Sequence, residues 1–125
     1  MRYNREEPFR YTFGQPVPAY FRISNIGGRG VSTAEGEAVI IDISPSGARI
    51  HTDLNIPFTK ENTVDIVLRF ELSDKELIQA GGIVWKNYKN EYGIDFFTED
   101  IDEKQLIEQL KLYTKNAMHI ENDNK

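Results

Sequence analysis

The segment Val64–Leu72 constrains the fold of this chain more than any other stretch. Its apolar residues alternate almost strictly with Asp65, Val67, Arg69 and Glu71, which is the pattern of a β-strand with one buried face. A chain of 125 residues is long enough for one hydrophobic core and too short for two. The sequence therefore predicts one domain in which strands of this kind enclose a single core.

Further strands are predicted on both sides of this segment. Arg10–Phe13 begins a strand that Ala19–Ile23 either continues or pairs with, because glycine and proline interrupt the pattern between them. The other segments with strand character are Glu35–Ile43, Ala48–Thr52, Leu77–Trp85 and Glu91–Phe97. About six strands joined by turns favour an antiparallel sheet that closes into a small barrel, since closure removes exposed edges. The predicted fold class is therefore mainly β.

Two glycine-rich stretches are predicted to shape the chain locally. Gly27–Gly30 favours a hairpin loop, because it lacks the Gly-Lys-Ser/Thr sequence and the following helix of a phosphate-binding loop. Gly81 and Gly82 indicate a bulge or a sharp coil within a strand.

The periodicity changes at Asp100, where a helix is predicted to begin. Asp100 is a suitable N-cap residue, and Leu106, Ile107 and Leu110 fall on one helical face. That face can pack on the barrel or on a second subunit, and the two arrangements give the same pattern. We expect the helix to span about 100–118.

The two ends of the chain lack such patterning. Residues 1–9 contain Pro8 and no helical or strand periodicity, so a flexible N-terminal arm is expected there. Residues 120–125 have little to bury and are expected to form a disordered tail. Residues 10–119 are then predicted to form a single barrel domain with its helix.

Composition and charge narrow the functional classes. The formal net charge of −5 argues against general nucleic-acid binding, which needs a broad basic face. Strand aromatics such as Tyr20 and Phe21 can stack on bases, but the acidic balance opposes a nucleic-acid-binding barrel. No run is long or apolar enough for membrane insertion or a secretory signal, and the chain has no cysteine, so a cytoplasmic location is expected.

The titratable residues do not form a recognisable catalytic motif. The two histidines, His51 and His119, have no motif around them and cannot supply three ligands to a metal ion. The chain has no cysteine nucleophile, and its paired carboxylates are expected to be solvated or to cap helices. We therefore expect neither an enzyme nor a metal or cofactor site.

A strand, a tight turn and a second strand are predicted across Asp42–Ile50. Asp42, Ser44 and Gly47 stand at fixed offsets in this stretch. By themselves these residues fit an ordinary hairpin corner, since serine and aspartate cap turns and glycine tolerates unusual backbone angles. They also fit a ligand-binding edge, because strands hold polar groups in place while a turn leaves them accessible.

The arginines of the N-terminal segment and the Asp42 turn together resemble the PilZ domain family. Its members carry an Arg-x-x-x-Arg element before the first strand and an Asp/Asn-x-Ser-x-x-Gly element between later strands, and the second is present in full as Asp42, Ser44 and Gly47. The segments Ile83–Trp85 and Tyr92–Phe96 resemble the family's last strand pair. The resemblance implies a six-stranded antiparallel β-barrel with a C-terminal α-helix that binds the bacterial second messenger cyclic di-GMP.

The resemblance also implies a role for each site residue. Arg5 and Arg10 would clasp a phosphate or stack on a guanine, because arginine offers a planar fork of donors. Asp42 would accept hydrogen bonds from the guanine edge. Ser44 would reach a phosphate or a polar group of guanine, and Gly47 would keep the turn free of a side chain. Binding would order the arm and present an altered surface to an unidentified protein partner.

The arginine spacing departs from the family pattern. Arg5 and Arg10 are separated by four residues instead of three, and Arg2 and Arg5 by two. A kink at Pro8 can absorb the extra residue, which leaves cyclic di-GMP binding intact. Alternatively the motif has degenerated, and the chain is a PilZ-like protein-interaction domain that does not bind the nucleotide.

Three residues are interpreted from their strands alone. Trp85 is the sole tryptophan and is expected in the core, because a large aromatic side chain in an apolar strand is usually buried. Arg49 and His51 are predicted to face outward. There Arg49 either adds positive potential beside the turn or is an ordinary surface residue.

Overall fold

The computed structural model describes residues 10–97 and 103–123, with helix side chains described for residues 104–115. The strands and the helix, in chain order, are β1 (Tyr11–Ile26), β2 (Arg29–Gly30), β3 (Gly36–Ser44), β4 (Gly47–His51), β5 (Val64–Glu71), β6 (Glu76–Lys86), β7 (Glu91–Phe96) and α1 (Glu103–Asp123).

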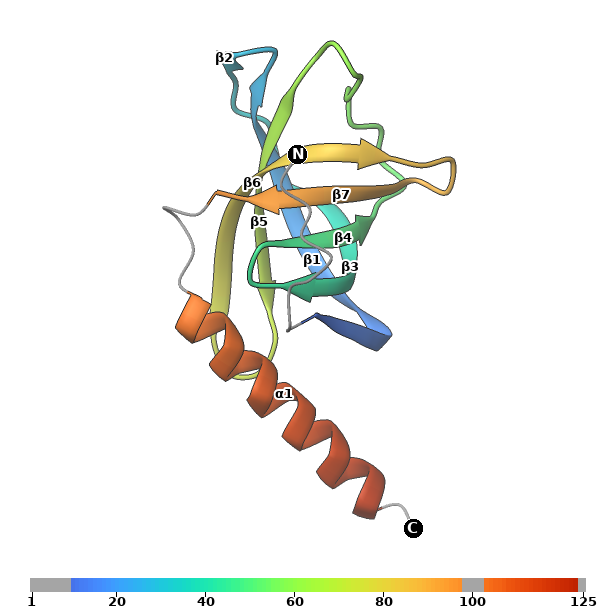
Figure 1. Ribbon diagram of the computed structural model, residues 1–125, viewed down its shortest axis with the longest axis vertical. Coiled ribbons are helices and arrows are strands. Elements are labelled where there is room, and N and C mark those ends of the chain that lie inside the picture. Colours follow the sequence, from blue (N-terminus) through green and yellow to red (C-terminus); the bar gives the residue numbers. More distant parts are fainter. Residues whose placement is uncertain (1–9, 98–102, 124–125) are drawn as a thin grey trace.

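Six of these strands close a barrel (Figure 1). Around the barrel the order is β1-β3-β4-β7-β6-β5, and β5 pairs with β1 to complete the ring. Every pairing is antiparallel. The short strand β2 pairs with the end of β1 after a turn in which Gly27 and Gly28 have positive φ. The six-stranded antiparallel barrel and the Gly27–Gly30 hairpin turn are therefore confirmed.

Strand β1 is long because the two predicted segments Arg10–Phe13 and Ala19–Ile23 belong to one strand. Thr12 pairs with Asp42, and the next pair on β3 joins Val17 to Ile40. Residues 13–16 therefore bulge out opposite a single residue of β3, which accommodates the glycine and proline that interrupt the pattern. The second half of β1 also pairs with β5, so this strand closes the barrel.

The alternating pattern of β5 supplies one wall of the core. Val64, Ile66, Leu68 and Phe70 are buried, while Arg69 is partly exposed on the other face. Inward-facing residues of the other strands complete the core, among them Phe21, Ile40, Ile50, Tyr92 and Ile94. Burial of apolar surface, at about 25 cal/mol per Å², is the main stabilising contribution expected from these side chains.

The helix α1 packs its first half against the barrel. Leu106 and Leu110 are completely buried, and the rings of Tyr113 and Phe13 pack in a T-shaped arrangement with centroids 5.3 Å apart. Gln109 donates a hydrogen bond to the Asp74 carboxylate at 2.8 Å, which ties the helix to the turn between β5 and β6. The later part of α1 extends away from the barrel (Figure 1).

The C-terminal boundary of the helix differs from that expected from the sequence. The described helix continues to Asp123 instead of ending at about 118, so residues 120–123, expected in a disordered tail, are helical. The predicted cap at Asp100 and the predicted arm at 1–9 lie outside the described residues. In the part of the chain that the structure describes, no helix is long and apolar enough to cross a membrane.

Candidate functional site

Four residues form a row of cross-strand neighbours on the outside of the barrel. Asp42 on β3 pairs with Arg49 on β4, Arg49 pairs with Gly93 on β7, and Gly93 pairs with Trp85 on β6. Residues that are directly opposite in adjacent strands have side chains within contact distance. The closed sheet thus brings an acid, a cation and a large aromatic ring together from segments far apart in the sequence.

A bulge in β3 places Asp42 in this row. Ile40 pairs with Ile50, and the next pair is Asp42 with Arg49, so Ile41 is an extra residue on β3. Without the bulge, alternation would give Asp42 the same inward direction as the buried Ile40. The extra residue reverses this direction, which is the usual way in which a bulge redirects a side chain.

A second bulge, in β6, places Trp85 in the same row. Ile83 pairs with Ile94, and the next pair is Trp85 with Gly93, so Val84 is the extra residue. Trp85 therefore lies half-buried on the outer face instead of following Ile83 into the core. The prediction that Trp85 is a core residue is wrong for this reason. Of the two alternatives predicted for Gly81 and Gly82, a bulge or a sharp coil, the bulge is wrong, because pairing with β5 and β7 is regular there.

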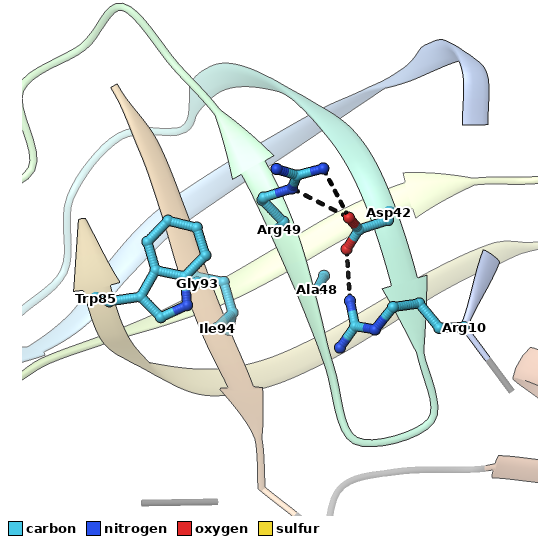
Figure 2. Close-up of a pocket in the computed structure, with 7 residues that line it drawn as sticks. All are labelled: Arg10, Asp42, Ala48, Arg49, Trp85, Gly93 and Ile94. Carbon is cyan, nitrogen blue, oxygen red and sulfur yellow. Dashed lines mark hydrogen bonds and ion pairs between the residues drawn. The ribbon is translucent and has the colours of Figure 1, made fainter. Parts of the chain in front are cut away.

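Asp42 is shared between two arginines (Figure 2). Arg10 Nη1 donates to Asp42 Oδ1 at 2.6 Å, and Arg49 donates to Asp42 Oδ2 through both Nε and Nη2 at 3.0 Å. The Asp42 side chain is only 8% exposed, whereas those of Arg10 and Arg49 are 28% and 36% exposed. A buried carboxylate needs such partners, because an unpaired buried charge is strongly destabilising.

A pocket of about 370 Å³ opens between these side chains and the indole of Trp85. It is lined by Arg10, Asp42, Ala48, Arg49, Trp85, Gly93 and Ile94. Its walls combine a planar aromatic ring, two planar guanidinium groups and a carboxylate. These groups suit a planar ligand that carries both hydrogen-bond donors and negative charge.

Gly47 is required by the packing of β4 on β7. A β-carbon at this position would collide with the carbonyl oxygen of Ile94. Ser44 is completely buried beside it, where its hydroxyl lies 3.3 Å from the Ser46 hydroxyl and 3.4 Å from the Gly47 carbonyl oxygen. Both residues thus fix the turn after Asp42 in this conformation.

The structure brings some of the predicted site residues together and leaves others apart. Arg10 and Asp42 form a direct ion pair, and Ser44 and Gly47 lie in the adjoining turn. Arg5 lies outside the described residues. Arg49 was predicted to face outward, and its place beside Asp42 follows from the Ile41 bulge, for which the sequence has no clear signal.

The histidines lie apart from this pocket. His51 faces outward as predicted, with Nδ1 3.0 Å from the Lys89 carbonyl oxygen and Nε2 3.2 Å from an Asp53 carboxylate oxygen. The side chain of His119 is outside the described part of the chain. Among the described residues, no group of three His, Cys, Asp or Glu side chains is placed to hold a metal ion.

The clear pKa shifts occur in a second charged cluster and at one further aspartate. Hydrogen bonds from Arg69 hold the pKa of Glu35 below its usual value, and its bonds to Glu35 and Glu76 raise the pKa of Arg69. Burial raises the pKa of Asp65. The Arg69 cluster joins β5 to the segment before β3 and to the start of β6, which indicates a role in holding the barrel wall together.

Two comparisons with known proteins bear on the identity of this chain. A search of curated proteins finds no match to it. The family model of the PilZ domain matches residues 3–113, which include all six barrel strands and the first half of the helix. This match covers far more than half of the chain and agrees with the barrel, the Asp42 turn and the closing helix. The chain therefore belongs to the PilZ domain family.

Proposed function

We propose that this PilZ domain binds cyclic di-GMP in the pocket between Asp42 and Trp85. PilZ domains are non-catalytic receptor domains, and the family generally binds this nucleotide. On binding, the domain changes the conformation of its N-terminal arm and signals to a protein partner in the cytoplasm.

The observation that carries the proposal is the ion pair between Arg10 and Asp42 at the pocket wall. The distance between Arg10 Nη1 and Asp42 Oδ1 is 2.6 Å, and a nucleotide of this kind can offer a new partner to each of the two side chains. The guanine edge offers two adjacent N–H donors to the Asp42 carboxylate, while a phosphate accepts the guanidinium fork of Arg10. An exchange of partners keeps both charges paired throughout, so neither pays the cost of an isolated buried charge.

The remaining site residues act around this exchange. Arg5 is proposed as the second arginine of the arm, which reaches the ligand once the arm is ordered. Ser44 and Gly47 keep the turn in the shape that presents Asp42. Arg10 immediately precedes β1 and adjoins the arm. Movement of its side chain from Asp42 to a phosphate therefore changes the position of the arm.

Titration of the protein with cyclic di-GMP by calorimetry tests this function. A saturable heat is expected for the wild type. A charge-assisted hydrogen bond contributes about 1.5–3 kcal/mol, so Arg10→Ala or Asp42→Ala should weaken binding by about 10- to 100-fold. Arg29→Ala, which removes an exposed arginine at the start of β2, is the matched control and should bind as the wild type does. Absence of heat for the wild type at high ligand concentration would refute the proposal.

A second candidate function is supported by the arginine spacing. Arg5 and Arg10 are separated by four residues, whereas the family element has three between its arginines. In this alternative the domain has lost the nucleotide and acts only as a protein-interaction module. A partner whose binding is indifferent to cyclic di-GMP, together with no heat in the titration, would favour it.

A further inference from the structure

We propose that Arg49 is a third arginine of this pocket and that it binds a phosphate group of the ligand. The inference rests on the proposed function, because it assigns a residue to the same site. Arg49 lies outside the Arg-x-x-x-Arg and Asp-x-Ser-x-x-Gly elements, and its place in the pocket emerges from the strand pairing described above.

The first argument is position. Arg49 stands between Asp42 and Gly93 in the row of cross-strand neighbours, so its guanidinium group projects between the carboxylate and the indole of Trp85 (Figure 2). It lines the pocket, and its side chain is 36% exposed. A ligand that touches both Asp42 and Trp85 would therefore lie within reach of Arg49.

The second argument is charge. The described side chains that line the pocket carry two positive charges, from Arg10 and Arg49, and one negative charge, from Asp42. The formal charge of the whole chain is −5, so this lining is positive against an acidic background. Loss of Arg49 would leave a lining without net charge, and the attraction of the pocket for an anion would weaken.

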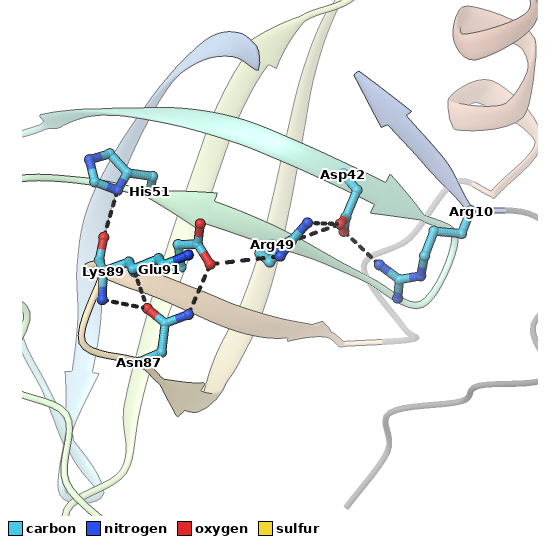
Figure 3. Close-up of polar contacts among 7 residues, drawn as sticks. All are labelled: Arg10, Asp42, Arg49, His51, Asn87, Lys89 and Glu91. Atoms are coloured by element: carbon cyan, nitrogen blue, oxygen red, sulfur yellow. Dashed lines mark hydrogen bonds and ion pairs between the residues drawn. The ribbon is translucent and has the colours of Figure 1, made fainter. Parts of the chain in front are cut away.

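The third argument is that Arg49 has a donor group, Nη1, that can serve a ligand. Its Nε and Nη2 are directed at Asp42, but Nη1 lies 3.7 Å from Glu91 Oε1, which is longer than a hydrogen bond. Asn87 donates to the same oxygen of Glu91 at 2.8 Å and fixes that carboxylate at the turn between β6 and β7 (Figure 3). Arg49 can thus keep its contacts with Asp42 through Nε and Nη2 while Nη1 donates a hydrogen bond to a phosphate.

Glu91 is then a positioning residue. It does not line the pocket, and it lies on the opposite side of Arg49 from Asp42 (Figure 3). The two carboxylates flank the guanidinium group on both sides. A phosphate in the pocket competes with Glu91, the more distant of the two partners.

Guanosine 5′-monophosphate and guanosine are suitable probes, because they differ only in the phosphate. Trp85 is the sole tryptophan, so its indole N–H resonance reports on the pocket in an NMR titration. The wild type should bind the monophosphate about 10-fold more tightly than guanosine. Arg49→Gln should lose a large part of this preference, because only Arg10 of the pocket lining is then left to bind the phosphate, and Arg49→Lys should keep most of the preference because it keeps the charge.

Two further variants control for charge and for fold. Arg29→Gln removes an exposed arginine outside the pocket and should keep the full preference. Glu91→Gln removes the competing carboxylate and should bind the monophosphate at least as tightly as the wild type does. The remaining amide resonances show whether each variant is folded, and Arg49→Lys tests the charge if Arg49→Gln does not fold.

Different experimental results would overturn the inference and the proposed function. An Arg49→Gln variant that keeps the full preference of the wild type for the monophosphate, or that binds both probes more tightly, would overturn the inference, as would a wild type without any preference. Cyclic di-GMP affinity that Arg49→Gln leaves unchanged would also overturn it. A wild type that shows the Arg49-dependent preference but gives no heat with cyclic di-GMP would refute the proposed function alone.

Discussion

The indole of Trp85 lies directly over Gly93, its cross-strand neighbour on the outside of the barrel. A β-carbon at residue 93 would occupy the space now filled by the indole nitrogen. The absence of a side chain at Gly93 thus lets the ring lie against the sheet and form one wall of the pocket.

Gly93→Ala is expected to displace the indole and damage the pocket. Trp85 is half-buried and can swing outward, so the free energy of unfolding should fall by less than about 1–3 kcal/mol, the usual cost of overpacking a core. The fluorescence of Trp85 should shift to longer wavelength, and cyclic di-GMP binding should weaken. An unchanged emission spectrum would show that the indole does not lie on Gly93.

Gly47→Ala is expected to destabilise the fold itself. The added methyl group would collide with the backbone carbonyl oxygen of Ile94, which cannot move without disturbing the pairing of β4 with β7. A loss of about 1–3 kcal/mol in the free energy of unfolding is expected in urea. Gly14→Ala, where no atom lies within 4 Å of the new carbon, is the control and should stay within about 0.5 kcal/mol of the wild type.

Gly47 shows what the sequence predicts about this site and what it does not. Gly47 was assigned from its place in a motif, with the role of keeping a side chain away from the ligand. The nearest obstacle to a side chain is instead the carbonyl oxygen of Ile94 on β7. Pairing between β4 and β7 joins residues forty or more positions apart, and no local pattern predicts it.

The barrel was largely predictable because two-residue alternation is a local signal. The predicted segment Val64–Leu72 corresponds to β5, which ends at Glu71, one residue before the predicted end. The pocket was less predictable, because it depends on the bulges at Ile41 and Val84, which reverse the direction of Asp42 and Trp85. A bulge changes one pairing in the sheet and leaves the apolar composition of its strand unchanged, so the sequence pattern does not reveal it.

Leu110→Ala tests whether the helix is part of the fold. Leu110 is completely buried at the contact between α1 and the barrel, so its truncation should cost about 2–5 kcal/mol in the free energy of unfolding. Lys111→Ala, an exposed neighbour on the same helix, should change that free energy by less than about 0.5 kcal/mol. Equal stability of the two variants in urea would mean that the helix does not dock as described.

Glu35→Gln is expected to lower the thermal stability in a pH-dependent way. Hydrogen bonds from Arg69 hold the pKa of Glu35 below its usual value of 4.5, so the folded state favours the charged carboxylate. The stabilisation is complete above that usual pKa and is lost as the pH falls through the lowered one. The difference in melting temperature between wild type and variant should therefore be present at neutral pH and vanish in strong acid. A difference that persists in acid would point to another cause.

The most direct test of the account is the structure of the protein crystallised with cyclic di-GMP. Arg10 and Asp42 contact each other at 2.6 Å in the structure described above. The account predicts that this pair separates in the complex, with Asp42 on the guanine edge and Arg10 on a phosphate. A nucleotide bound elsewhere, or one bound while Arg10 and Asp42 remain paired, would contradict it.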